Sequence, residues 1–217
     1  MPAVPNPVVI ATRNAGKVKE FEAMLGKLGL EVQSLADYPA IPDIPEDGAT
    51  FRDNAIIKAR AVAERLNRAV IADDSGLCVD RLDGAPGVYS ARFAGEQATD
   101  AENNAKLLRK LQELAPESAW PQGADAADGT SVELLSAARF VCVLALVVPG
   151  KEQPVTAEGN CEGFILGKSR GDGGFGYDPL FYLPQLGQSM AELSLEEKNR
   201  LSHRSQALKR FMELISH

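Results

Sequence analysis

The chain has 217 residues, a formal net charge of −7, 45% hydrophobic residues and 24% charged residues. This composition is typical of a globular protein that buries a core without disulfides or a structural metal, and it excludes wholesale disorder. The negative charge argues against a nucleic-acid polymer as the main partner, because contact with a phosphate backbone requires a basic surface. It is compatible with a small nucleotide held with a divalent cation, since such cations are bound by carboxylates.

Neither a membrane anchor nor an export signal is expected. The most apolar stretch, residues 140–148, is less than half of the ~20 residues that a membrane helix needs. The first residues contain no basic region followed by a long apolar run, so we expect no signal peptide. Three widely spaced cysteines without a CxxC motif predict reduced thiols, and only two histidines exclude a zinc site built from several histidines. We therefore expect a soluble cytoplasmic protein.

The first elements alternate between strand and helix. Residues 7–12 are rich in β-branched side chains and predict a strand. Apolar residues at helical spacing follow up to a stop at Gly29, and residues 30–35 predict a second strand. Residues 36–48 are expected to form a loop. Thr50 is expected to cap a helix that runs to about Asn67.

The middle of the chain is richer in strands. Residues 69–72 and 77–80 predict two strands, separated by Asp73-Asp74-Ser75-Gly76. A capping box from Thr99 to Glu102 opens a helix, and residues 115–136 are predicted to form an exposed loop insertion. Strands over 139–148 and 155–166 are expected to form a hairpin. The whole pattern predicts an α/β fold with a mixed sheet in one chain-continuous unit.

The last part of the chain is predicted to be a glycine-dense loop followed by helices. The loop covers residues 167–176. A second capping box runs from Ser194 to Glu197, and Ser202 is expected to cap the final helix. The loop satisfies G-x-G-x-x-G, but Pro179 follows where the dinucleotide motif requires a helix, so we reject that reading.

One candidate phosphate site lies where the first strand runs into the first helix. Helix N-termini expose unpaired N–H groups and partial positive charge, which suit phosphate. An ordinary Asn-capped helix start with solvated cations explains the same residues equally well. The candidate residues are Thr12, Arg13, Asn14, Ala15, Gly16 and Lys17.

A candidate metal site lies at the adjacent carboxylates Asp73 and Asp74. Carboxylates at a strand end can hold a hard cation, but neighbouring residues in extended chain point to opposite faces. Only one is therefore expected to act directly, and Asp74, next to Ser75-Gly76, is the candidate. The alternative is an acidic turn exposed to water.

Two further groups could recognise a nucleotide. Four glycines within residues 171–176, followed by Tyr177 and Asp178, place backbone donors beside aromatic faces. Lys198, His203 and Arg204 could form a cation cluster at the start of the final helix. The alternatives are a flexible hairpin tip and a solvated helix face.

Five ordered segments carry a family resemblance. The chain resembles the inosine triphosphatase (Ham1-like) family of non-canonical purine nucleoside triphosphate pyrophosphatases. The resemblance implies a long central sheet flanked by helices, two lobes in a single ITPase-like domain, a nucleotide cleft between the lobes, and a homodimer. It also implies Mg²⁺-dependent hydrolysis of dITP, ITP and XTP to the monophosphate and pyrophosphate. The matching segments are VVIATRNAGKVKEF, GATFRDNAIIKARA, VIADDSGLCVDRLDGAPGVYSARFAG, GGFGYDPLFY and AELSLEEKNRLSHRSQALKRF.

The resemblance also implies residue roles. Residues 12–17 would bind the triphosphate, with Arg13 contributing its backbone only. Asp74 would accept the proton and hold the metal, and Ser75 would touch the substrate. In the family two acidic residues commonly precede the second segment, and here only Glu46 lines up as the other metal ligand. The base and ribose would be bound by Phe175, Gly176, Tyr177 and Asp178, with Phe175 stacking on the purine, and by Lys198, His203 and Arg204.

This hypothesis predicts that Lys17, Asp74, Phe175 and Arg204 surround one groove. Two alternatives stay open on the sequence alone. One is a Maf-like pyrophosphatase for modified pyrimidine nucleotides, which a substrate panel would distinguish. The other is a catalytically silent nucleotide-binding protein, which would bind ITP without releasing pyrophosphate.

Overall fold

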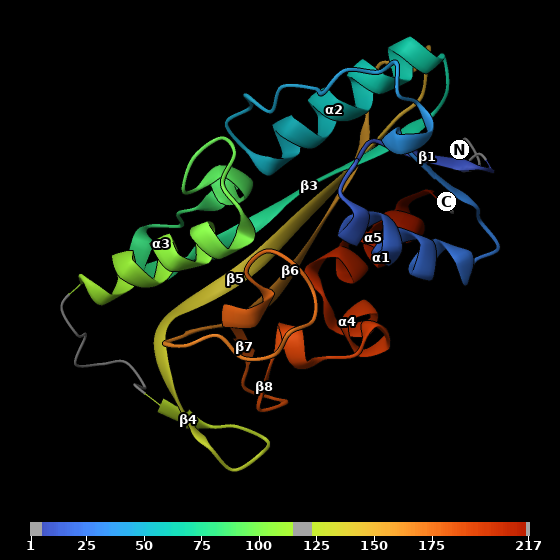
Figure 1. Ribbon diagram of the computed structural model, residues 1–217. Helices are drawn as coiled ribbons and strands as arrows, with labels where there is room; N and C mark the ends of the chain where they lie inside the picture. The colour runs from blue at the N-terminus through green and yellow to red at the C-terminus, as the bar shows by residue number, and fades with distance from the viewer. Residues whose placement is uncertain (1–5, 115–122, 216–217) are drawn as a thin grey trace. The chain divides into compact units, whose positions relative to one another are not determined.

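The computed structural model describes residues 6–114 and 123–215, which divide into two units (Figure 1). Unit 1 takes in the described residues up to Ser75, Val141–Asn160 and those from Asn199 onward. Unit 2 takes in Gly76–Phe140 and Cys161–Lys198, apart from 115–122.

A mixed sheet provides the framework of the chain. Its strand order is β2-β1-β3-β5-β6-β7-β8, with β4 paired to β5. β1 is parallel to both β2 and β3, whereas β6 and β7 are antiparallel, as are β7 and β8. The α/β class with a mixed sheet and flanking helices is therefore as predicted. The strands are β1 Val8–Ile10, β2 Val32–Ser34, β3 Val70–Val79, β4 Gly123–Asp125, β5 Ser131–Val147, β6 Val155–Leu166, β7 Phe181–Leu183 and β8 Gln188–Ser189.

Helices begin where side chains cap their first N–H groups. Asn14 accepts a bond from the Lys17 N–H, and Thr50 accepts one from the Asp53 N–H. The predicted capping boxes at Thr99 and Ser194 both form. Ser202 accepts from the Ser205 N–H in the last helix. The helices are α1 Ala15–Gly26, α2 Phe51–Leu66, α3 Asp100–Gln112, α4 Leu195–Leu201 and α5 His203–Ile215.

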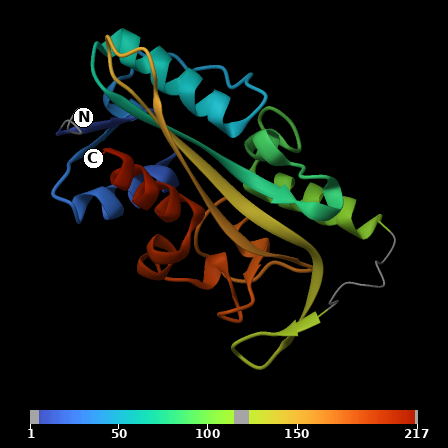
Figure 2. The ribbon, with the colours of Figure 1, turned by 180° about the vertical axis from the view of Figure 1, so that it is seen from behind.

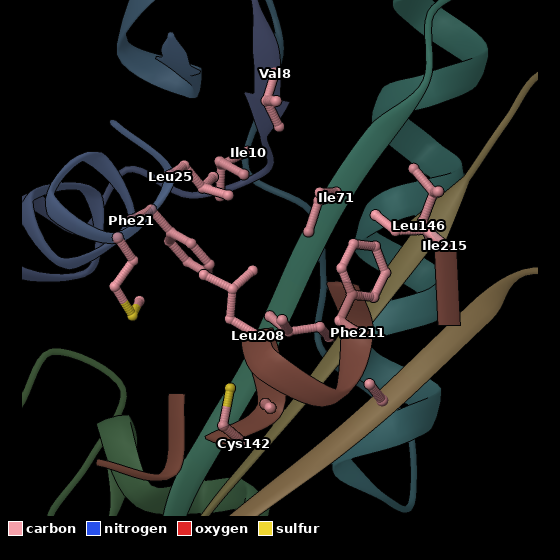
Figure 3. Packing of buried hydrophobic residues seen from close by; sticks show 14 residues of the cluster. Val8, Ile10, Phe21, Leu25, Ile71, Cys142, Leu146, Leu208, Phe211 and Ile215 are labelled. Atoms are coloured by element: carbon pink, nitrogen blue, oxygen red, sulfur yellow. The ribbon is translucent and has the colours of Figure 1, made fainter. Parts of the chain in front are cut away.

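Strand alternation divides the core of unit 1 into two apolar clusters. Val8 and Ile10 of β1 pack in one cluster, whereas Val9 packs in the other. The first cluster is closed by α1 and α5, and Figure 3 shows Phe21 and Phe211 among its side chains. Small residues of α2 close the second cluster. Figure 2 shows α1 and α5 side by side, on the face of the sheet that α2 does not cover.

Unit 2 has its own core beneath α3. Leu107 and Leu111 lie one helical turn apart and pack with Phe140, Phe181 and other buried side chains. The rings of Phe140 and Phe181 lie 4.4 Å apart between centroids. The sequence pattern of α3, with leucines on one face and charged residues on the other, accounts for this packing.

Two predictions of secondary structure are wrong. Residues 69–80 were expected to break at Asp73–Gly76, but β3 is continuous because both aspartates are buried and paired. Residues 123–136 are predicted to be loop, but β4 pairs with β5 there, and Val132 is buried between the exposed residues Ser131 and Glu133. Residues 115–122 lie outside the described part.

All three cysteines are free thiols, as predicted. Burial raises the pKa of Cys142 to about 12 and the pKa of Cys161 to about 11, so both stay protonated at neutral pH. Cys78 is half-buried. Within the described residues, no helix is both long and apolar enough to cross a membrane.

We predict that Gly159→Ala lowers the free energy of unfolding by about 1–3 kcal/mol. A methyl group there would overlap the backbone nitrogen of Ala207 and the carbonyl oxygen of His203, where β6 meets α5. Gly26→Ala is the matched control, because open space surrounds that position and alanine favours a helix. Urea unfolding measures both variants. Equal stability of the two variants would contradict the close contact between β6 and α5.

Candidate active site

A buried ionic cluster in unit 1 is centred on Asp73 of β3. Asp73 Oδ2 lies 3.0 Å from Lys17 Nζ and 3.0 Å from Arg204 Nη2. A second nitrogen of Arg204 pairs with Glu20, which lies one turn after Lys17 on α1. Asp73 and Arg204 are 0% and 1% exposed. The cluster therefore joins α1, β3 and α5 through charged groups that have lost their water.

The charges of this cluster balance. Burial alone would raise the pKa of Asp73, but Lys17, Arg204 and Lys58 together lower it well below its usual range. Burial alone would lower the pKa of Arg204, and Asp73 and Glu20 more than compensate, so the guanidinium stays charged. In this cluster the two carboxylates of Asp73 and Glu20 are therefore matched by the two cations of Lys17 and Arg204.

Asp74, the next residue of β3, makes a separate set of contacts with α2. Its Oδ2 accepts a bond from Asn54 Nδ2 at 3.0 Å, and its Oδ1 accepts one from the Ser75 N–H at 3.0 Å. Lys58 Nζ lies 3.7 Å from Asp74 Oδ1 and 3.1 Å from Glu46 Oε1. Asn54 and Lys58 are four residues apart in α2 and so share one face of that helix.

The surroundings of Asp74 carry excess negative charge. Two carboxylates, Asp74 and Glu46, both lie within ion-pair distance of the ammonium of Lys58. Burial raises the pKa of Asp74, Lys58 and Lys17 oppose that effect, and Glu46 adds to it, leaving the pKa above its ordinary value. Burial alone would lower the pKa of Lys58, but Asp73, Asp74 and Glu46 raise it overall, so Lys58 stays charged.

This donor set fits Mg²⁺ delivered with a substrate. Among the described residues, no group of three or more His, Cys, Asp or Glu side chains could hold a metal alone. Mg²⁺ commonly takes one or two carboxylates and completes its shell with water and substrate phosphates. Asp74 and Glu46, which both pair with Lys58, would be such a pair, and their negative charge favours a cation.

The predicted phosphate segment starts α1. Asn14 Oδ1 accepts the Lys17 N–H at 3.0 Å, and Thr12 Oγ1 accepts the Asn14 N–H at 3.2 Å. Ala15 is exposed and Gly16 is half-buried, and the N–H groups of a first helical turn have no acceptor within the helix. The Arg13 side chain turns to the 41–43 loop, where it pairs with Asp43 at 3.0 Å.

The residues predicted to bind the base lie together in unit 2, apart from His203 and Arg204. Lys198 Nζ donates to Asp178 Oδ2 at 2.7 Å and lies 4.5 Å from the centroid of the Phe175 ring. The same carboxylate oxygen accepts the Phe175 N–H at 2.9 Å. The Tyr177 hydroxyl donates to the carbonyl of Ser90, so this ring is held in the core. Burial and the charge of Asp100 raise the pKa of Tyr177 above its usual range.

The structure therefore brings the predicted residues together in two groups. Within unit 1, Lys17, Ser75 and Arg204 meet around Asp73, and Asp74 lies with Glu46 at Lys58. Within unit 2, Phe175, Asp178 and Lys198 are in contact. Gly176 and Tyr177 continue the same loop.

The predicted cation cluster of Lys198, His203 and Arg204 has two sets of partners in this structure. Lys198 pairs with Asp178, whereas Arg204 pairs with Glu20 and Asp73 and is 1% exposed. His203 is also buried.

Several site residues were missed from the sequence. Asn54 and Lys58 are polar residues among the buried alanines of α2, and their spacing of four could have identified them. Glu20 stands beside Phe21 on the buried face of α1. A charged residue at a core position is a signal, because it requires a buried partner.

Comparisons with known proteins agree over nearly the full chain. A sequence model of the Ham1 family matches residues 8–214. A dITP/XTP pyrophosphatase from Geobacillus kaustophilus (strain HTA426) is 52% identical over 206 residues, which are 95% of this chain and 92% of the relative. A dITP/XTP pyrophosphatase from Halalkalibacterium halodurans is 52% identical over 201 residues, which are 93% of this chain and 94% of the relative. The solved structure of a HAM1 protein from Coxiella burnetii covers 98% of this chain and 99% of its own, with 38% identity and a TM-score of 0.80.

We predict that Arg204→Met destabilises the protein by about 3–5 kcal/mol, because it leaves buried carboxylates without their partner. Arg210→Met on the same helix is the control, since Arg210 is exposed and bonds one backbone carbonyl. Adding Glu20→Gln to Arg204→Met should recover part of the loss. Chemical denaturation measures all three variants. Similar losses for Arg204→Met and Arg210→Met would refute the role of the ion pairs.

Proposed function

Because this chain belongs to the Ham1 family, we propose that it is a nucleoside triphosphate pyrophosphatase that hydrolyses dITP, ITP and XTP and so cleanses the nucleotide pool. The observation that carries the proposal is the environment of Asp74. This carboxylate is 4% exposed, is oriented by Asn54 and the Ser75 N–H, and stands in a site with excess negative charge. These are properties of a proton acceptor beside a cation.

Asp74 accepts the proton of the attacking water in this proposal. The water oxygen forms a bond to the first phosphorus atom of the triphosphate, and the bond from that phosphorus to the bridging oxygen breaks. Pyrophosphate leaves with the electron pair of that bond, and the proton passes to Asp74. The bonds from Asn54 and Ser75 hold the carboxylate in one orientation, which favours in-line attack.

Asp74 and Glu46 would hold Mg²⁺. When bound, that ion neutralises charge on the phosphoryl oxygens. Lys58 keeps the two carboxylates close together and limits their repulsion.

The triphosphate is proposed to bind at the start of α1. The N–H groups of Ala15 and Gly16 and the ammonium of Lys17 provide positive charge, and Thr12, Asn14 and Ser75 add neutral donors. Arg13 contributes its backbone, in agreement with the pairing of its side chain with Asp43.

The base is proposed to stack on Phe175. Lys198 covers one face of that ring, which assigns the other face to the purine. Gly176, Tyr177 and Asp178 complete the proposed base and ribose pocket, together with Lys198, His203 and Arg204. A donor directed at the 6-oxo group, from Arg204, protonated His203 or a backbone N–H, would pair with hypoxanthine and clash with adenine. An unmatched buried polar group costs about 1–3 kcal/mol, enough for ~5–150-fold discrimination.

A single domain of two lobes, a homodimer and a cytoplasmic location are further parts of the proposal.

We predict that Asp74→Asn abolishes pyrophosphate release from dITP while the melting temperature changes little. The amide keeps an oxygen for the bond from Asn54, but it cannot take a proton from water. Asp53→Asn is the control, since Asp53 is an exposed carboxylate at the start of α2. A near wild-type rate for Asp74→Asn would remove Asp74 from the chemistry.

Lys17→Ala is expected to raise the KM for dITP more than it lowers kcat, because it removes charge from the phosphate site. Lys19→Ala alters an exposed lysine of the same helix and should leave the KM unchanged. Steady-state kinetics with dITP give the KM and kcat of both variants. An unaltered KM in Lys17→Ala would contradict the phosphate role.

A further inference from the structure

Two side chains of α3 hold the backbone N–H and the carbonyl of one residue, Gly176, in the glycine-rich loop of unit 2. Asp100 Oδ2 accepts the Gly176 N–H at 2.7 Å, and Asn104 Nδ2 donates to the Gly176 carbonyl at 2.9 Å. Asp100 and Asn104 are four residues apart, so both project from one face of the helix. Both the donor and the acceptor of Gly176 are therefore fixed by a rigid element that lies more than 70 residues away in sequence.

This contact acts at a residue with a left-handed backbone conformation. Gly176 has a φ of +62°, in the left-handed region that glycine adopts freely, and it follows Phe175 directly. Phe175 itself is held by two other contacts. The carboxylate of Asp178 accepts the Phe175 N–H, and the ammonium of Lys198 lies over the Phe175 ring. Without the contacts from α3, rotation at Gly176 would change the path of the loop beside the Phe175 ring.

We propose that Asp100 and Asn104 are positioning residues for recognition of the purine base. The inference rests on the proposed function, because it assigns Phe175 as the surface on which the base stacks. Neither side chain need touch the nucleotide. Their effect is to keep the Phe175–Asp178 loop in its binding conformation before the substrate arrives, so that binding does not have to order it.

The test compares base binding with phosphate binding. Asn104→Asp keeps the shape of the side chain but replaces the donor by a carboxylate oxygen facing the Gly176 carbonyl. Asp100→Ala removes the acceptor, whereas Asp100→Asn retains an oxygen that can accept the same bond. We expect Asn104→Asp and Asp100→Ala to raise the KM for dITP by about 3- to 10-fold, with kcat within about 2-fold, and Asp100→Asn to stay close to the wild type.

Two further readouts separate positioning from general stability. The inhibition constant of inorganic tripolyphosphate should not change, because that compound has no base. Glu102→Gln is the matched control, since Glu102 lies in the same helical turn and caps Thr99 instead of holding Gly176. It should lower the melting temperature without changing the KM for dITP.

The inference is overturned if Asn104→Asp and Asp100→Ala leave the KM for dITP at the wild-type value. It is also overturned if Glu102→Gln raises that KM as much as they do. Calorimetric titration with IMP provides the same comparison without turnover. A wild-type protein that binds IMP but releases no pyrophosphate from dITP refutes the proposed function alone, and the calorimetric comparison then decides the inference. A wild-type protein that binds no IMP refutes the inference.

Discussion

The ion pairs of Asp73 with Lys17 and Arg204 are the interaction on which the rest of unit 1 depends. A buried carboxylate without partners would cost several kcal/mol, and here two cations from different helices stabilise it. Their pairing allows β3 to continue through an acidic sequence and fixes α1 and α5 beside it. Because neighbouring residues of a strand face opposite ways, the same geometry turns Asp74 toward α2.

The two aspartates therefore differ in the charges around them as well as in the direction of their side chains. Asp73 lies in a set of charges that balance, with its pKa held far below the ordinary value. Asp74 and Glu46 both pair with Lys58. The pKa of Asp74 is raised, and burial is the largest cause. A balanced set favours structure, whereas a set with surplus negative charge favours a bound cation and a proton transfer. The contrast arises from residues that are adjacent in sequence.

Local signals in the sequence predicted much of the fold, and contacts between distant residues explain the errors. The caps at Asn14, Thr50, Thr99 and Ser194 could be predicted because a cap involves residues two or three positions apart. Strand alternation predicts that Asp73 and Asp74 face opposite ways, and the position of Asp74 next to Ser75-Gly76 makes it the candidate. The continuity of β3 could not be predicted, because it depends on Arg204, 131 residues away. The ion pairs of Arg204 with Glu20 and Asp73 could not be predicted for the same reason, since both partners are far from it in the sequence.

Pyrophosphate release from dITP, XTP, GTP and ATP, measured with and without Mg²⁺, tests most directly the claim that the Asp74 site supports metal-assisted hydrolysis of non-canonical purine nucleotides. The account predicts rapid release from dITP and XTP with Mg²⁺, little from GTP and ATP, and loss of release when the ion is removed with EDTA. Release that continues unchanged in EDTA, or equal rates with ATP and dITP, would contradict it.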